Sequence, residues 1–165
     1  MNSKIKRIID FSTAFGPSGM EDEVSSLAME DVKDICEVHD DTMRNTYMHF
    51  KQDKEHETTI LLDAHADEVG FIVQAIKPNG TIRFLPLGGW DPKNIVSGEV
   101  WILNDKGEKI SGIVASQPVH FLSEEKRNGK VDFDDLVIDV GATSVQEVKE
   151  EFHISIGNFM CPAVT

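Results

Sequence analysis

The side chains best suited to chemistry form one short cluster, His65-x-Asp67-Glu68. Imidazole is a common ligand for zinc-like metals, and a carboxylate placed nearby can fix its tautomer. On this interpretation His65 binds a metal through one ring nitrogen, and Asp67 orients the ring without binding the metal. Glu68 then supports the loop or faces substrate. The spacing alone is also typical of a hydrogen-bonded loop histidine beside solvated acids, which is the more common case.

The remaining histidines have no partner at a spacing typical of metal sites, so each is interpreted as a structural or surface residue. His120 is the strongest exception, because it follows a proline in a loop that could face a neighbouring site. The five residues in this class are His39, His49, His56, His120 and His153.

Nucleophilic and phosphate-binding chemistry find little support in the sequence. Ser18 is followed by Glu21 at the spacing of a capping box, so a helix N-cap is favoured over a nucleophile. Cys36 and Cys161 have no histidine at a known catalytic spacing, and Cys36 lies on an apolar register that indicates a buried filler. The turn glycines in Gly88-Gly89 and Asn79-Gly80 are not followed by the Gly-Lys-Ser/Thr pattern of a phosphate loop.

The His65 cluster must be positioned by the strand expected before it. Residues 58–62 are a short apolar, β-branched run, which predicts a buried strand. The polar residues 63–68 follow directly at its carboxyl end, where open α/β sheets bind their ligands. Upstream, apolar periodicity predicts a helix that ends at Gly16-Pro17 and a second helix over 19–34.

A hairpin and a β-rich region complete the expected elements. Strands over 36–43 and 47–51 form a partly exposed hairpin. After Gly70, short strands with turn signals indicate a small barrel or sandwich. Its expected parts are a hairpin of 71–76 with 81–85 around a type I′ turn at Asn79-Gly80, a second hairpin of 100–103 with 109–115, a strand over 136–140, a helix capped by Ser144 and Glu147, a polar loop over 126–135, and a last strand within 156–164 that returns to the first region.

Composition limits which classes of partner and which cellular compartment we expect for this chain. The formal net charge of −13 with 16 Lys and Arg argues against nucleic acid or an anionic membrane as a partner. Two distant cysteines indicate neither a disulfide framework nor a thiolate zinc site, which favours a reducing cytoplasm. The N-terminus lacks the apolar core of a signal peptide, and no stretch is long enough to span a bilayer. We therefore expect a soluble cytoplasmic protein.

Four motifs, in order, resemble those of the tetrahedral or deblocking aminopeptidases, which include glutamyl aminopeptidases and proteins once called cellulase M. That resemblance implies an α/β catalytic domain with two zinc or cobalt ions, interrupted by a small β-rich domain that helps dimers assemble into a hollow dodecamer. It implies that His65 binds one metal and that Asp67 supports it. The motifs are Gly-Pro-Ser-Gly-Met-Glu at 16–21, Leu-Asp-Ala-His-Ala-Asp-Glu-Val-Gly-Phe at 62–71, Leu-Gly-Gly-Trp at 87–90 and Ile-Asp-Val-Gly-Ala at 138–142.

The same resemblance implies how the chain is divided. Residues 1–69 would be the first segment of the catalytic domain, 70–160 an inserted dimerisation or assembly domain, and 161–165 the start of a return to the catalytic domain. The bridging aspartate, general-base glutamate, remaining carboxylate ligand and second histidine of the family would lie further on. We therefore expect a full-length form that hydrolyses N-terminal residues from peptides as a homo-oligomer, and a 165-residue chain that is truncated and inactive alone.

Two alternatives stay open. The chain could instead be a non-catalytic assembly or regulatory fragment built on the β domain. A metallocarboxypeptidase or amidohydrolase is a weaker rival, since those families share the HxD histidine but not the other motifs.

Two residue-level expectations concern the fold itself. Arg44 stands where the family usually has glycine in an Asp-x-x-Gly-Asn turn, which questions whether that turn keeps its shape. If much of the catalytic sheet is absent, Leu61 and Leu62 would lack cover, and we expect low stability or self-association.

Overall fold

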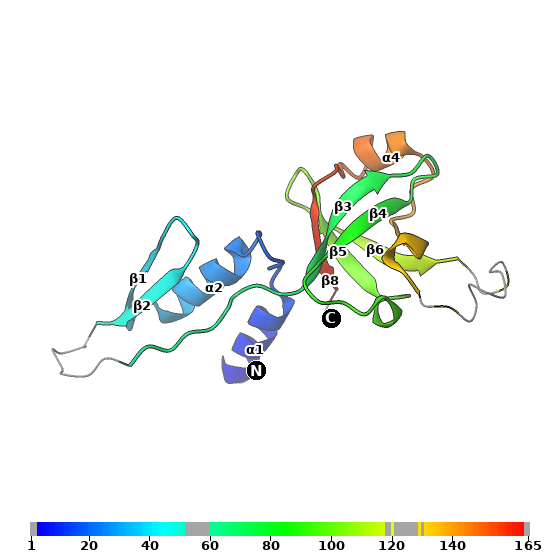
Figure 1. Cartoon of the computed structure of the whole chain (residues 1–165). Helices are drawn as coiled ribbons and strands as arrows, with labels where there is room; N and C mark the ends of the chain where they lie inside the picture. The colour runs from blue at the N-terminus through cyan, green and yellow to red at the C-terminus, as the bar shows by residue number, and fades with distance from the viewer. Residues whose placement is uncertain (1–2, 52–59, 118–119, 121–128, 130, 164–165) are drawn as a thin grey trace. The chain divides into compact units, whose positions relative to one another are not determined.

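Two helices and a two-stranded hairpin make up the first of two units, residues 1–67, and a β-barrel makes up the second, residues 68–165 (Figure 1). The computed structural model describes residues 3–51, 60–117, 120, 129 and 131–163. No helix in these ranges is both long and apolar enough to cross a bilayer.

The first unit begins with α1 (Ser3–Thr13) and α2 (Asp22–Val32), followed by the antiparallel strands β1 (Cys36–Asp40) and β2 (Thr46–Phe50). Both helices and the hairpin confirm the predicted elements. The elements α1, α2 and β1 end before their predicted last residues, and β2 lies one residue earlier than predicted. The helices meet through an ion pair between Arg7 and Asp31, 2.8 Å apart.

The predicted cap of α2 at Ser18 is wrong. The residue before the helix is Glu21, whose side chain makes no cap hydrogen bond to α2, and the helix starts four residues after Ser18. The Ser18 hydroxyl is instead bonded to the carboxylate of Asp67, so it is not available to the helix. Two acidic residues in the first turn, Asp22 and Glu23, supply the negative charge that a helix N-terminus favours.

The turn between β1 and β2 keeps a left-handed residue although glycine is absent. Arg44 has φ +67°, and its guanidinium pairs with Asp22 and, at 3.6 Å, with Asp40. One Asp41 oxygen accepts from the backbone N–H groups of Met43 and Asn45, at 2.9 and 3.0 Å. These contacts hold the turn in a conformation that an L-residue adopts only at a cost of roughly 1–2 kcal/mol.

The buried strand predicted over 58–62 is wrong for the residues that the structure describes. Residues 60–67 have no regular secondary structure, and Ile60, Leu61 and Leu62 are 82%, 84% and 90% exposed. A strand needs a neighbour to pair its backbone groups, and no strand in the described ranges pairs with this segment. Residues 58 and 59 lie outside the described residues.

The second unit is a closed six-stranded barrel with the order β3-β4-β7-β6-β5-β8 (Figure 1). The β-rich architecture predicted after Gly70 is therefore confirmed as a barrel. Its elements are β3 (Gly70–Ile76), β4 (Ile82–Leu87), the 3-10 helix η1 (Pro92–Asn94), β5 (Glu99–Leu103), β6 (Lys109–Ser116), the 3-10 helix η3 (Phe133–Asp135), β7 (Leu136–Asp139), α4 (Val145–Glu150) and β8 (Phe159–Pro162).

The strand β8 closes the barrel, which corrects the prediction that a last strand returns to the first region. It pairs on one side with β3 and on the other with β5. Cys161 and Pro162, expected to begin a return segment, pair with Trp101 and Val100 inside the barrel. Because both edges of β8 are bonded, the sheet has no free edge there.

The barrel interior is a continuous apolar core. In β6 and β7 buried residues alternate with more exposed ones, as the two-residue period of a strand requires. The helix α4 covers one part of the core with the fully buried Val148, and Ser144 caps it by accepting from the Glu147 N–H at 3.2 Å, as predicted. The largest fully buried side chains include Phe71, Ile82, Ile102, Leu136, Ile138 and Met160.

The first barrel hairpin turns differently from the type I′ turn that was predicted. Gly80 alone takes a left-handed φ, +82°, whereas a type I′ turn would require positive φ at Asn79 as well. The Gly80 N–H donates to the Lys77 carbonyl at 2.9 Å, which closes a four-residue turn with Pro78 in its second position. Proline is favoured at that position because its ring fixes φ near the value that the turn requires. The turn is therefore centred one residue closer to the N-terminus than predicted.

Gly80 gives a test of this turn. A Cβ at position 80 would lie 2.4 Å from the Ala142 carbonyl oxygen, whereas Gly107, with φ +77°, has open space around it. We expect Gly107→Ala to cost about 1 kcal/mol of barrel stability from backbone strain alone, and Gly80→Ala to cost roughly 3 kcal/mol or more from strain and collision. Urea unfolding followed by tryptophan fluorescence measures this, since both tryptophans, Trp90 and Trp101, lie in the barrel. Equal losses for the two variants would contradict the close approach.

Asp105 gives a pH-dependent test. Hydrogen bonds from the Ser155 hydroxyl and then the Asn158 amide lower the pKa of the Asp105 carboxyl. Since the folded pKa is depressed, this stabilisation is present above the unfolded value of about 3.9 and is lost as pH falls through the folded pKa. Carbon-13 NMR titration should place the Asp105 pKa below that of an unfolded chain, and Ser155→Ala should raise it. An unchanged pKa in Ser155→Ala would show that the bond is not formed in solution.

Candidate functional site

The His65 cluster lies in the extended segment that ends the first unit. The His65 Nδ1 atom is 3.0 Å from Oδ1 of the Asp67 carboxylate and 2.9 Å from the Asp67 backbone carbonyl oxygen. The His65 side chain is 86% exposed, while that of Asp67 is 37% exposed. One ring nitrogen is therefore engaged by Asp67, and the ring itself is open to solvent.

Asp67 is held from a second direction by Ser18. The Ser18 hydroxyl donates to Oδ2 of Asp67, so the two carboxylate oxygens serve two different donors. The Ser18 bond, followed by the contact with His65, lowers the pKa of the Asp67 carboxyl. Asp67 is thus kept as a carboxylate, which can only accept hydrogen bonds.

This arrangement selects one tautomer of His65. Both groups near Nδ1 are acceptors, so Nδ1 must carry the proton of a neutral ring. The lone pair then resides on Nε2, which is the state in which imidazole binds a metal. A carboxylate behind a ligating histidine also raises the basicity of the ligand.

Among the described residues, no group of three or more His, Cys, Asp or Glu side chains is placed to hold a metal ion. His65 with Asp67 therefore fits the chemistry of one metal ligand and its support. Two metals would require further donors.

The other candidates do not join this cluster. Glu68 begins the second unit and is half-buried. His120 is exposed, and His153 approaches Lys106, with 2.6 Å between Nε2 and Nζ. His56 lies outside the described residues.

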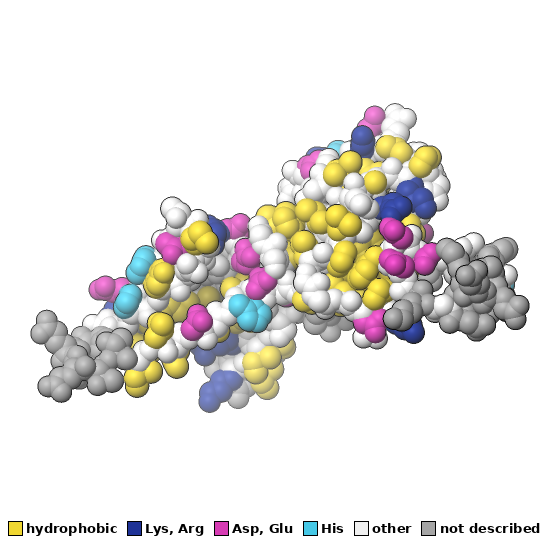
Figure 2. Space-filling model, in the orientation of Figure 1, with side chains coloured by type: hydrophobic (Ala, Val, Ile, Leu, Met, Phe, Trp, Pro, Cys, Tyr) yellow, Lys and Arg dark blue, Asp and Glu magenta, His cyan; other side chains and the backbone are white. Residues whose placement is uncertain are grey.

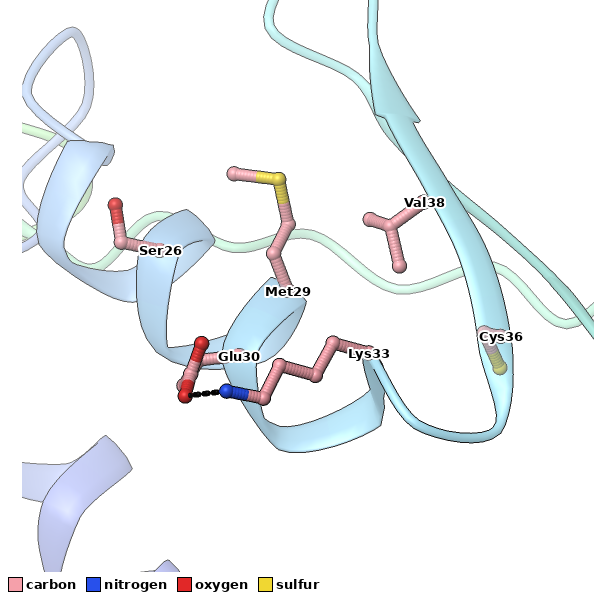
Figure 3. Close-up of a pocket in the computed structure, with 6 residues that line it drawn as sticks. All are labelled: Ser26, Met29, Glu30, Lys33, Cys36 and Val38. Atoms are coloured by element: carbon pink, nitrogen blue, oxygen red, sulfur yellow. Dashed lines mark hydrogen bonds and ion pairs between the residues drawn. The ribbon is translucent and has the colours of Figure 1, made fainter.

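A groove between α2 and β1 has no histidine among its lining residues. Figure 3 shows Met29 and Val38 pointing toward one another across it, with the ion pair of Glu30 and Lys33 at its rim. Its volume is about 440 Å³. Cys36 lines it as a buried thiol, as the sequence predicted, and no histidine accompanies it. The groove has no nucleophile and base in contact, so it is not a catalytic centre.

Ser18 is the residue of this cluster that sequence reasoning did not place there. It is 49 residues from Asp67 in the chain, and its spacing to Glu21 pointed to a local cap instead. The only sequence signal was the Gly-Pro-Ser-Gly stretch that precedes the His65 segment in the same ordered set of motifs.

The tautomer of His65 can be tested directly. At pH 8, long-range ¹H–¹⁵N NMR should show His65 with Nδ1 protonated, and Asp67→Ala should shift the ring toward a mixture of tautomers. Asp63→Ala, an exposed acid in the same segment, is the matched control and should leave the tautomer unchanged. A ring that is protonated on Nε2 in the wild type would contradict the geometry.

Comparison with known proteins identifies a family whose members resemble this chain. A family model described as M42 glutamyl aminopeptidase matches residues 45–165. Lysyl aminopeptidase of Pyrococcus furiosus is 34% identical over 160 residues, which cover 94% of this chain and 44% of that protein. Glutamyl aminopeptidase of Lactococcus lactis is 36% identical over 110 residues, covering 66% of this chain and 30% of that protein.

Solved structures agree in fold. A TET aminopeptidase from a marine sediment archaeon of the Thaumarchaeota superimposes with a TM-score of 0.89 at 34% identity, covering 98% of this chain and 45% of that one. The TET1 peptidase of Pyrococcus horikoshii, which can assemble into a tetrahedron or a large octahedral shell, gives a TM-score of 0.82 at 28% identity, covering 97% and 46%. The chain spans less than half the length of the curated relatives that it matches.

Proposed function

The chain belongs to the M42 glutamyl aminopeptidase family, and on that premise we propose that it supplies one metal ligand, His65, to a peptidase that removes N-terminal residues from peptides. The observation that carries this proposal is the pairing of His65 with Asp67, in which a carboxylate holds Nδ1 and leaves the Nε2 lone pair exposed.

His65 would contribute the Nε2 donor to zinc or cobalt, since imidazole is a common ligand for first-row divalent metals. A pair of divalent ions, when bound, supplies the positive charge that polarises a peptide carbonyl and acidifies a water molecule. Asp67 keeps the ring in its donor tautomer and stays outside the coordination sphere. Ser18 holds the carboxylate in place, so the ligand is oriented before the metal arrives.

We assign the two units to two roles within such an enzyme. The first unit would be the opening segment of an α/β catalytic domain, whose remaining donors the described residues do not supply. The barrel would be the inserted domain through which copies of the protein assemble. Its support is the closed architecture with a core of its own and the likeness to TET peptidases, one a dodecamer and another that can assemble into a tetrahedron or a large octahedral shell. A cytoplasmic location remains a prediction.

A second candidate, a non-catalytic assembly module, is favoured by one observation. The barrel has a continuous core and bonded strands, whereas the segment 60–67, which carries His65, has no regular secondary structure and is mostly exposed. On that account the barrel alone would carry the role of the 165-residue chain.

Metal retention and peptidase activity separate these candidates. We expect the tag-free chain to bind Zn²⁺ or Co²⁺ through His65, His65→Gln to abolish that binding event, and Asp67→Ala to weaken it roughly 10–100-fold. His120→Gln is the control for loss of an exposed histidine and should leave it unchanged. We expect no turnover of N-terminal glutamyl, lysyl or leucyl amide substrates by this chain, since it offers one ligand.

The outcomes are distinct. Metal binding that ignores His65→Gln would contradict the proposed ligand. Turnover that depends on His65 would rule out the assembly-only candidate.

A further inference from the structure

The loop between α1 and α2, residues 14–21, brings Ser18 to the Asp67 carboxylate (Figure 1). Residues 14–17 of this loop are all buried, whereas α1 buries no residue and α2 buries one. The segment that carries His65 is open to solvent, and histidine and acidic side chains are visible at the surface along it in Figure 2. An exposed ring is thus supported, through Asp67, by a buried loop.

Gly16 of this loop lies against both α2 and the segment that carries His65. A Cβ atom at position 16 would be 2.6 Å from Cγ2 of Val24 in α2 and 3.8 Å from the carbonyl oxygen of Ala66. The first distance is well inside van der Waals contact, so a side chain at position 16 fits only if Val24 or the loop moves. The absence of a side chain therefore sets how closely α2 approaches the loop two residues before Ser18.

Carboxylates from the start of α2 hold the same loop on both sides of Ser18. The Glu23 carboxylate accepts a hydrogen bond from the Phe15 N–H at 3.1 Å, and Phe15 is buried. The Glu21 carboxylate accepts from the Gly19 N–H at 2.6 Å. Hydrogen bonds to an ionised acceptor are stronger than those between neutral groups, so these two contacts restrict the backbone that presents the Ser18 hydroxyl.

We propose that Gly16 and Glu23 are positioning residues of the candidate metal site, acting through Ser18 on Asp67. The contacts form one series: α2 fixes the loop, the Ser18 hydroxyl bonds to Oδ2 of Asp67, and Oδ1 of Asp67 bonds to Nδ1 of His65. Groups that orient a ligand need support of their own, because a ligand held loosely loses more freedom when it binds. This inference rests on the proposed function, in which His65 is a metal ligand.

Val24 offers a rescue of the substitution at Gly16. Gly16→Ala places a methyl group against Cγ2 of Val24, and Val24→Ala removes that atom. Long-range ¹H–¹⁵N NMR of the 165-residue chain at pH 8 measures the His65 tautomer, and addition of zinc chloride followed on the same ring measures its affinity. We expect Gly16→Ala to give a mixture of tautomers and to weaken the zinc response about 2–10-fold, the factor that one hydrogen bond contributes. The double variant Gly16→Ala/Val24→Ala should recover both properties.

Glu23 is tested by a graded pair of substitutions. Glu23→Ala removes the acceptor of the Phe15 N–H and should change the His65 ring in the same direction as Gly16→Ala, whereas Glu23→Gln keeps an acceptor oxygen and should recover most of the wild-type behaviour. Asp22→Asn is the matched control, because it removes a charge from the same turn of α2 but Asp22 pairs with Arg44 of the hairpin. It should leave the His65 ring unchanged.

Two results would overturn the positioning role. One is a wild-type tautomer and zinc response in both Gly16→Ala and Glu23→Ala, and the other is a double variant that stays as impaired as Gly16→Ala. If Gly16→Ala fails to fold, the comparison of Glu23→Ala with Glu23→Gln decides. A wild-type His65 ring that ignores zinc would count against the proposed function, while the tautomers of the variants would still report whether the loop orients the ring.

Discussion

The need to pair backbone donors and acceptors is the constraint on which both units depend. In the barrel this need is met all the way round, because β8 bonds to β3 on one edge and β5 on the other. The apolar core follows from that closure, since every strand then presents one face inward. In the first unit, no strand of the described residues pairs with the segment 60–67, and Leu61 and Leu62 are exposed although an apolar run of this kind is typical of a buried strand.

The chemistry rests on a smaller interaction, the Asp67 carboxylate with its two donors. Ser18 and His65 approach different oxygens, and the resulting low pKa of Asp67 keeps the group an acceptor. That state fixes the His65 tautomer with the lone pair on Nε2, the nitrogen that we propose as a metal ligand. The exposed His65 ring is oriented by its contacts with Asp67, and the Asp67 carboxylate is held in turn by Ser18.

Much of the fold could be predicted from local patterns. Alternating strands with turn residues predicted the barrel hairpins, and the spacing of Ser144 and Glu147 predicted the cap of α4. The failures share a physical cause, which is that a distant partner competes with a local one. Ser18 was predicted as a cap but bonds to Asp67, 49 residues away. The residues around Leu61 have the composition of a strand, but a strand forms only where a neighbouring strand pairs with its backbone groups.

The candidate site shows the same division. The type and spacing of His65 and Asp67 indicated a ligand and its support, and the structure brings the two side chains together as the sequence suggested. A two-metal centre needs further donors, and the described residues do not supply them. The most direct measurement is ¹⁵N NMR of His65 during addition of Zn²⁺ to the wild-type chain. We predict a large shift of Nε2 while Nδ1 stays protonated and bonded to Asp67. Coordination through Nδ1, or no change at either nitrogen, would contradict the account.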